Sequence, residues 1–353
     1  MKIGKVDVAP SFALAPMAGM TDTAFRRLVK RRGGCGLVVT EMVSSEGLVR
    51  GIDRTLEYAE YTEEERPVSI QIFGGDPEKM AAAAQIVEGM GADIVDVNMG
   101  CPVPKIAKHN AGCSLMREPA HAASVIRAMT RAVTIPVTVK MRAGWDASDV
   151  NAPDLAKRIE DVGAAAVAVH GRTAAQSYSG SSDWDLIARV ASGLSIPVLG
   201  SGDCLEPSQM VERMQHGVAG VLVGRGALRN PFIFEQAQAL AAGRPVRAIT
   251  HEERGRFLLE YIELLQNERL HESPGFRHVA PGIGAGPAPS ERSGSGEPRG
   301  HDKWVINKLR ALNSWYTKGI DNGSHLRVSI NAAQSIPHLR AIIEEFFLAP
   351  AAV

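Results

Sequence analysis

The sequence predicts a parallel (β/α)8 TIM barrel followed by a small C-terminal helical domain. Three observations favour this α/β fold class. Eight short apolar, β-branched runs precede residue 230, alanine-rich helical stretches separate them, and polar motifs follow nearly every run. A doubly wound open sheet shares the alternation, but it needs no particular strand count and usually places one ligand motif after its first strand.

The expected strands are short because each apolar run is bounded by turn-forming or polar residues. In chain order they are Phe12–Leu14, Leu37–Thr40, Val68–Ile72, Ile94–Val97, Val137–Met141, Val167–Val169, Pro197–Leu199 and Val221–Val223. Helices are expected between them at Pro77–Gly89, Ala120–Ala132, Pro153–Val162, Trp184–Ala191 and Pro207–His216. The segment Arg229–Gly243 then closes the barrel region.

The chain divides into an expected barrel domain at 1–245 and a helical domain at 246–353. The second domain is expected to hold helices at His251–His271, His301–Lys318 and Ala332–Phe347. Between the first two lies Ser273–Gly300, which is rich in proline, glycine and serine and has no apolar periodicity. Such a composition buries too little surface to offset ordering entropy, so a flexible insertion at 273–300 is expected. An arm that touches RNA is the alternative.

Composition and charge place the protein among ordinary globular chains. Hydrophobic residues make up 45% and charged residues 22% of 353 residues, and 39 lysines and arginines balance 39 acidic residues. No global field therefore attracts nucleic acid, and such a partner would need a local patch. The four cysteines show neither a CxxC pair nor metal spacing, and no apolar run approaches membrane-spanning length. We expect a cytoplasmic protein with free thiols, no metal and no membrane contact.

Chemistry in a parallel barrel gathers where the strands end and the βα loops begin. The expected strand ends place the following residues there: Pro16, Met17, Ala18, Glu41, Gln71, Asn98, Cys101, Lys140, Arg142, His170, Arg172, Ser201, Gly202, Asp203, Gly224 and Arg225. The loops "GSGD" and "VGRG" follow the seventh and eighth strands, where barrels commonly hold a phosphate. Their glycines let backbone N–H groups approach an anion, with Arg225 as the charged partner. A plain tight-turn role for these glycines is the alternative.

A phosphate site beside Gln71, Lys140 and His170 describes a place for flavin mononucleotide (FMN). The flavin ring offers hydrogen-bond acceptors, and a cation near its N1 stabilises the reduced form. Lys140 is the candidate for that cation. The alternatives are a buried lysine paired with Glu41 or Asp96, and a satisfied core histidine at His170.

These residues stand in motifs that resemble those of the tRNA-dihydrouridine synthase family. The motifs are "APMAGMTDTAFRRL", "EMVSSEGL", "QIFGGDPEKM", "DVNMGCPVPKI", "VKMRAGW", "VHGRT", "GSGD" and "VGRGALRNPFIF". The resemblance runs from Leu14 to about Phe234. The tail segment "KLRALNSWYTKGI" resembles the family's helical RNA-binding domain, and the match is closest to the bacterial B subgroup.

The resemblance implies an FMN enzyme, expected as a monomer, that uses NADPH to reduce specific uridines in tRNA to 5,6-dihydrouridine. The residues that it implies for FMN are Pro16, Met17, Ala18, Gln71, Lys140, His170, Ser201, Gly202, Asp203, Gly224 and Arg225. Hydride would pass from flavin N5 to C6 of uracil, and Cys101 would give the proton to C5. Asn98, Arg142 and Arg172 are expected to contact the substrate. The family more often has asparagine at position 201 and arginine at position 174, where this chain has Ser201 and Ala174.

Cys101 in "NMGCP" suits a proton donor because a thiol is mostly protonated at neutral pH. Gly100 permits a close backbone approach and Pro102 stiffens the loop. A buried small apolar residue is the alternative role for this cysteine. The other three cysteines, Cys35, Cys113 and Cys204, are expected to have only that structural role.

RNA contacts require basic residues, because phosphates dominate binding of nucleic acids. The candidates are Arg26, Arg27, Lys30, Arg31, Arg32, Lys303, Lys308, Arg310 and Lys318, with the aromatic residues Trp304, Trp315 and Tyr316 nearby. Solvated helix faces and core aromatics are the alternatives. A rival function is an FMN-dependent barrel reductase of a small pyrimidine or enone, although such a substrate does not require the helical domain.

Overall fold

The computed structural model describes residues 1–107, 110–267 and 300–349. The expected insertion at 273–300 lies outside the described residues, apart from Gly300. Among the described residues, no helix is both long and apolar enough to cross a bilayer.

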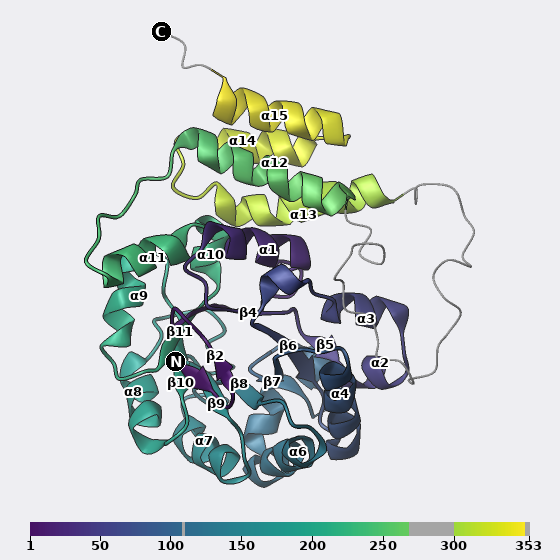
Figure 1. Ribbon diagram of the computed structural model, residues 1–353, viewed down its shortest axis with the longest axis vertical. Helices are drawn as coiled ribbons and strands as arrows, with labels where there is room; N and C mark the ends of the chain where they lie inside the picture. Colours follow the sequence, from purple (N-terminus) through teal and green to yellow (C-terminus); the bar gives the residue numbers. More distant parts are fainter. Residues whose placement is uncertain (108–109, 268–299, 350–353) are drawn as a thin grey trace.

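A closed ring of eight parallel strands forms the barrel (Figure 1). The strands are β3 (Phe12–Leu14), β4 (Leu37–Val39), β6 (Val68–Phe73), β7 (Ile94–Met99), β8 (Val137–Arg142), β9 (Ala166–His170), β10 (Val198–Ser201) and β11 (Gly220–Val223). Strand β11 pairs with β3, and β4 pairs with β6, so the ring has no open edge. The short β5 (Val43–Ser44) adds a further pairing to β6. The predicted fold class is confirmed, and every expected run overlaps one of these strands.

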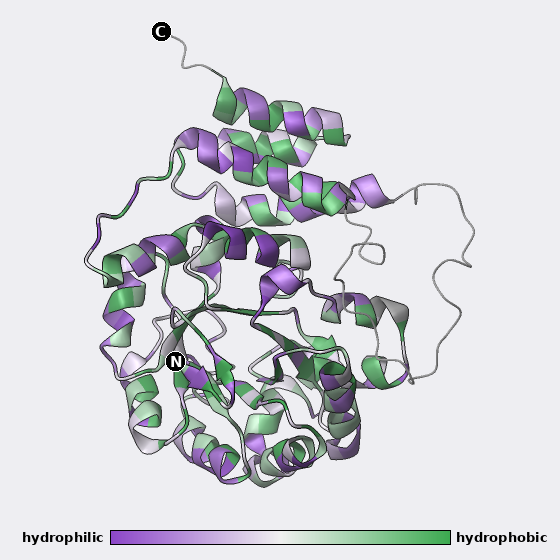
Figure 2. Cartoon of the chain, viewed as in Figure 1, coloured by the Kyte–Doolittle hydropathy of each residue, from purple (hydrophilic) through white to green (hydrophobic). Residues whose placement is uncertain are grey.

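Amphipathic helices surround the barrel because each buries one apolar stripe against the strands. The longer ones are α1 (Thr23–Arg32), α4 (Pro77–Gly89), α6 (Pro119–Ala132), α7 (Ala152–Asp161), α8 (Trp184–Gly193), α9 (Pro207–Met214) and α11 (Ile233–Ala241). Shorter ones are α2 (Ser45–Val49), α3 (Asp53–Ala59), α5 (Pro104–Ala107) and α10 (Arg225–Arg229). In α6, Val125, Ile126 and Met129 share the buried face. Hydrophilic and hydrophobic residues accordingly alternate around these helices in Figure 2.

The barrel interior is packed rather than open. Small and branched side chains, including Ala13, Val39 and Leu222, form a buried cluster inside the strands. The hairpin β1 (Lys2–Ile3) and β2 (Val6–Asp7) adds Ile3 to this cluster. A cavity of about 30 Å³ inside the barrel is lined by Ile3 as well as by Lys140. In barrels of this kind the ligand site lies at the carboxyl ends of the strands.

The tail contains α12 (His251–Asn267), α13 (His301–Tyr316), α14 (Gly323–Ala332) and α15 (Ile336–Leu348), stacked beside α1 in Figure 1. The expected helix Ala332–Phe347 is wrong at its start, because the backbone leaves the helix at Ala333 and re-enters it after Ser335. The Ser335 hydroxyl accepts the N–H of His338 and caps α15. Helix α14 was not predicted, because it contains glycine, serine, histidine and asparagine, which are weak helix formers.

Aromatic side chains fasten the tail to the barrel. The ring of Phe25 on α1 meets the edges of Phe257 and Tyr261 on α12, with centroids 6.1 and 6.3 Å apart. Phe232 lies 6.0 Å from Phe257 on its other side. These rings are almost fully buried, so the tail is packed against the barrel and not merely tethered to it.

Candidate active site

Strand register brings the predicted polar residues together at the carboxyl ends of neighbouring strands. Asn98 on β7 is the register partner of Lys140 on β8. Arg142 on β8 pairs in register with His170 on β9, and His170 with Ser201 on β10. Five side chains from four neighbouring strands therefore lie in one arc, as the strand-end argument predicts.

A chain of hydrogen bonds runs from the barrel core to the loop after β7. Thr138 donates to Asp96 Oδ1 at 2.6 Å, and Gln71 Nε2 donates to Asp96 Oδ2 at 2.7 Å. Asn98 Nδ2 then donates to Gln71 Oε1 at 2.8 Å. Burial raises the pKa of Asp96, and its two hydrogen-bond donors and Lys140 oppose that shift. This chain fixes the orientation of both amides, because Asp96 accepts from Gln71.

Asn98 also holds the loop that carries Cys101. Its Oδ1 accepts the N–H of Gly100 at 3.1 Å and the N–H of Cys101 at 2.9 Å. The Cys101 carbonyl accepts the N–H of Cys113 at 3.1 Å, and the thiol belongs to a partly exposed residue. Asn98 thus acts on the loop through its carbonyl oxygen, and its predicted contact with substrate stays a prediction.

Two arginines brace the loops of the mouth through several hydrogen bonds each. Arg142 donates to the carbonyls of Gly100 at 2.8 Å, Thr173 at 3.0 Å and Ser177 at 2.9 Å. Arg172 is 2% exposed and donates to two backbone carbonyls and to Asp203 at 2.9 Å. Their predicted contacts with substrate stay predictions, while the geometry gives both a bracing role.

Lys140 is partly buried at the mouth, and its ammonium makes no ion pair with Glu41 or Asp96 among the described residues. Glu41 instead lies 3.6 Å from Lys308 of the tail. The pKa of Lys140 is lowered to about 8, chiefly by burial and also by Arg142, while Asp96 opposes the shift. A cation held in a desolvated position without a partner is costly, which marks Lys140 as a functional candidate.

His170 is buried beside four cations and stays neutral. Burial is the main cause that lowers its pKa to about 2, and Lys140 and Arg142 add to the shift. Its Nε2 lies 3.4 Å from Arg172 Nη1, which makes Nε2 the acceptor. The neutral ring therefore keeps its proton on Nδ1, which can donate a hydrogen bond.

The loops after β10 and β11 form a cradle in which a side chain would not fit. Gly202 has φ +121°, and a Cβ there would collide with Ser182 and approach His170 Cδ2. Asp203 receives Arg225 Nη2 at 3.3 Å and the N–H of Ser182 at 2.7 Å. Asp203 therefore orients Arg225 rather than facing an anion itself.

The loop after β3 closes the cradle from the other side. Met17 Sδ lies 3.2 Å from the point where a Cβ of Gly224 would stand. The N–H of Met17 donates to Thr21 Oγ1 at 3.0 Å. Pro16 lines the inner cavity together with Lys140, and Ala18 is exposed. All eleven predicted cofactor residues thus occur on the strands and loops that surround one opening.

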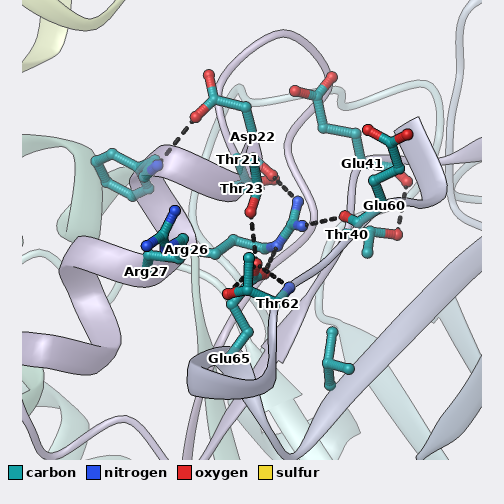
Figure 3. A network of polar contacts seen from close by, with 12 residues as sticks. Thr21, Asp22, Thr23, Arg26, Arg27, Thr40, Glu41, Glu60, Thr62 and Glu65 are labelled. Carbon is teal, nitrogen blue, oxygen red and sulfur yellow. Dashed lines mark hydrogen bonds and ion pairs between the residues drawn. The ribbon is translucent and has the colours of Figure 1, made fainter. Parts of the chain in front are cut away.

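Most of the basic residues of α1 are paired with carboxylates, and the burial of Arg26 corrects its prediction as an RNA contact. Arg26 is 2% exposed and donates to Glu65 at 2.6 Å (Figure 3). Arg27 and Arg31 both pair with Glu64, and Arg32 pairs with Glu260 at 2.5 Å. The partners are distant in sequence, so charge counting along α1 could not reveal the neutralisation. Tyr316 is a core residue of the tail, as the alternative interpretation held.

Tyr178 is the residue that sequence reasoning missed at the mouth. It is 60% exposed, and the guanidinium of Arg225 lies 4.9 Å from its ring centroid. Arg142 lies 5.9 Å from the same ring. An exposed aromatic ring between two arginines is a stacking surface. A lone aromatic within the polar loop "TAAQSYSGS" was the signal that could have found it.

Comparison with known proteins now adds to this geometry. The family model described as "Dihydrouridine synthase (Dus)" matches residues 13–285. The chain is 35% identical to a "Probable tRNA-dihydrouridine synthase" of Rickettsia conorii over 98% of this chain and 96% of that protein. It is 42% identical to "tRNA-dihydrouridine synthase B" of Xanthomonas campestris pv. campestris over 69% and 74% of the two chains. It is 44% identical to a "Probable tRNA-dihydrouridine synthase" of Rhodobacter capsulatus, over 67% of this chain and 73% of that protein.

Solved structures resemble this chain in fold alone. One described as "TcOYE with pHBA" has a TM-score of 0.51 and 13% identity, and the match covers 72% of this chain and 94% of that structure's chain. A morphinone reductase variant in complex with tetrahydroNAD has a TM-score of 0.50 and 12% identity over 68% and 90% of the two chains. Because the family model and the full-length Rickettsia relative agree, the chain belongs to the dihydrouridine synthase family.

Proposed function

We propose that this protein is an FMN-dependent tRNA-dihydrouridine synthase that reduces specific uridines with NADPH as the electron source. One observation carries the proposal. Among the described residues the ammonium of Lys140 makes no ion pair, and Lys140 is the register partner of Asn98, which holds the Cys101 loop from the adjacent strand. A cation for a reduced ring and an acid for a carbon centre therefore face one opening.

The chain's own residues fit FMN at this opening. Gly202 and Gly224 lie in the loops after β10 and β11, where backbone N–H groups can bind a phosphate, and Asp203 holds Arg225 beside those loops. Lys140 would approach the pyrimidine part of the flavin, where negative charge develops on reduction, and the neutral His170 would donate a hydrogen bond. FMN, when bound, would supply the hydride that uracil C6 accepts.

Cys101 is the proposed proton donor to C5 of the uracil. Its backbone N–H is bound to Asn98, and its loop is bound to Arg142 through the carbonyl of Gly100. These two anchors limit the motion of the thiol relative to Lys140. A well-positioned acid contributes about 10² to 10⁴ in rate.

The substrate class follows from the relatives' names and from the mouth of the barrel. A uridine must leave its stack to reach such a recessed site, at a cost of a few kcal/mol. The exposed ring of Tyr178 offers a stacking surface for a base at the rim. We propose a domain division near residues 245 and 246, with the tail as the tRNA-binding part of a cytoplasmic monomer.

The test is single-turnover oxidation of the photoreduced, anaerobic protein, followed by flavin absorbance. Unmodified tRNA should reoxidise the flavin quickly, whereas dihydrouridine-containing tRNA and free uridine should not. Cys101→Ala should abolish the fast phase with FMN still bound. Cys35→Ala is the matched control, because that buried thiol lies outside the mouth and its removal should leave the fast phase intact. Equal reactivity toward free uridine would move the function to a small-molecule reductase.

A further inference from the structure

A buried ion cluster joins the tail to the loop that follows β3. Lys308 on α13 places its Nζ 3.0 Å from Asp22 Oδ2 and 3.6 Å from Glu41 Oε1. The same ammonium donates to the carbonyl of Gly19 at 3.2 Å. The side chain of Lys308 is only 14% exposed, so this lysine, predicted as an RNA contact, faces the barrel instead.

The peptide units around Gly19 are held on both sides. The N–H of Gly19 donates to Glu41 Oε2 at 2.5 Å, and its carbonyl accepts from Lys308. Gly19 has φ +80°, a conformation that glycine adopts without strain. Further along the loop, Arg26 Nη1 donates to the carbonyl of Thr21 at 2.8 Å (Figure 3). The tail therefore supplies one of the restraints on a loop whose other anchors belong to the barrel.

Lys308 is also the cation that separates two carboxylates. Burial raises the pKa of Glu41, Asp22 adds to that shift, and Lys308 opposes it. Burial would lower the pKa of Lys308, but Asp22 and Glu41 outweigh it and the net shift is upward. Tyr261 on α12 donates to Asp22 Oδ2 at 2.7 Å and stabilises the same carboxylate from the tail. Without Lys308, Glu41 would either repel Asp22 or take up a proton. Either change would alter the hydrogen bond that Glu41 accepts from the N–H of Gly19.

The restrained loop borders the proposed cofactor pocket. It contains Met17, whose sulfur lies against Gly224 in the phosphate cradle, and it follows directly from Pro16, which shares the inner cavity with Lys140. A shift of Gly19 would be passed to Met17 through the turn in which the N–H groups of Met20 and Thr21 donate to the Met17 carbonyl.

We propose that Lys308 is a positioning residue for the Met17–Gly19 segment, so that helix α13 of the tail completes the cofactor pocket of the barrel. The expected effect on FMN binding rests on the proposed function, whereas the restraint of the loop by Lys308 does not. The tail then has a second task besides docking a substrate, since the pocket is incomplete without it.

The test replaces Lys308 with methionine in the full-length protein, which keeps the length of the side chain and removes its charge. Lys303→Met is the matched control, because Lys303 is an exposed lysine of the same helix. Two quantities are measured for each protein. One is the hydrogen exchange rate of the peptide around Gly19, and the other is the dissociation constant of FMN from titration of the apoprotein. A thermal melt checks that each variant is folded.

We expect Lys308→Met to speed exchange around Gly19 and to raise the FMN dissociation constant about tenfold, the effect of losing one buried charged hydrogen-bond donor. Lys303→Met should change neither quantity. Adding Glu41→Gln to Lys308→Met should restore part of the FMN affinity, because the repulsion with Asp22 is gone and the amide oxygen can still accept the N–H of Gly19.

Unchanged exchange in a folded Lys308→Met protein would overturn the inference, whatever the flavin result. Faster exchange with an FMN dissociation constant within twofold of wild type would also overturn it, because the loop would then move without affecting the pocket. Failure of the wild-type protein to bind FMN would instead overturn the proposed function, and the exchange comparison would still decide whether Lys308 restrains the loop.

Discussion

Replacing Asn98 with alanine tests whether this side chain positions the proposed acid. In the structure its Oδ1 accepts two backbone N–H groups, from Gly100 and Cys101, and its Nδ2 donates to Gln71. Asn98→Ala removes all three hydrogen bonds and leaves no side-chain acceptor in their place. Asn98→Asp is the matched variant, because a carboxylate can still accept both N–H groups, while its second oxygen replaces the donor to Gln71 with an acceptor.

The expected size follows from these contacts. Each hydrogen bond contributes a net of about 1 kcal/mol, so the loss of three should lower the free energy of unfolding by about 3 kcal/mol, less where water replaces the partner. The effect on rate should be of similar size, because a displacement of about 1 Å at a reacting group costs about 10²-fold, or about 2.7 kcal/mol. Asn98→Asp should keep much more of the rate, since the Cys101 N–H retains its acceptor.

The assay is single-turnover reduction of unmodified tRNA by the reduced, FMN-loaded variant, with saturating tRNA so that binding does not limit. A separate titration measures tRNA affinity. A fall of about 10² in the Asn98→Ala rate with nearly unchanged tRNA affinity supports the positioning role. A rate within threefold of wild type, or a loss confined to tRNA affinity, would refute it and favour direct contact with substrate.

Three further predictions concern stability. Lys140→Met should stabilise the apoprotein near pH 7, and this gain should fade as pH rises from about 8 to 10.5. In that range the Lys140 ammonium loses its proton in folded wild type but keeps it in the unfolded chain, so wild type gains stability. Denaturant titrations across this range measure the difference in the free energy of unfolding. His170→Gln should reduce the loss of stability as pH falls below 6.5, because only the unfolded chain protonates His170 there, and acid titration followed by circular dichroism measures it. Gly202→Ala should cost at least about 2 kcal/mol more than Gly217→Ala in chemical denaturation, since both have positive φ but only Gly202 lacks space for a Cβ.

The barrel could be predicted because its signals are local. Each strand is a β-branched run that ends at a polar residue, and Pro77–Gly89 was predicted with the bounds of α4. The tail was harder because α14 has a weak intrinsic preference for helix, and its residues Leu326 and Ile330 form helix by packing against the rest of the tail. The break at Ala333–Ser335 was missed, although Ser335 followed two residues later by proline is a helix-start signal.

The candidate site could be predicted as a set of positions but not as a set of roles. Strand ends identified Asn98 and Arg142, yet only the folded chain reveals that their polar atoms hold neighbouring loops. The same limit applies to Arg26 and Lys308, whose acidic partners lie far away in sequence. A sequence shows which side chains carry charge, and the fold decides which of those charges remain available.

The central claim is tested most directly by incubating the full-length protein with FMN, NADPH and an unmodified tRNA transcript, and then analysing the nucleosides by mass spectrometry. We expect dihydrouridine at defined positions, formed by wild type and by Cys35→Ala and lost in Cys101→Ala. Absence of dihydrouridine with a wild-type protein that holds FMN and oxidises NADPH would contradict it, as would equal product from Cys101→Ala.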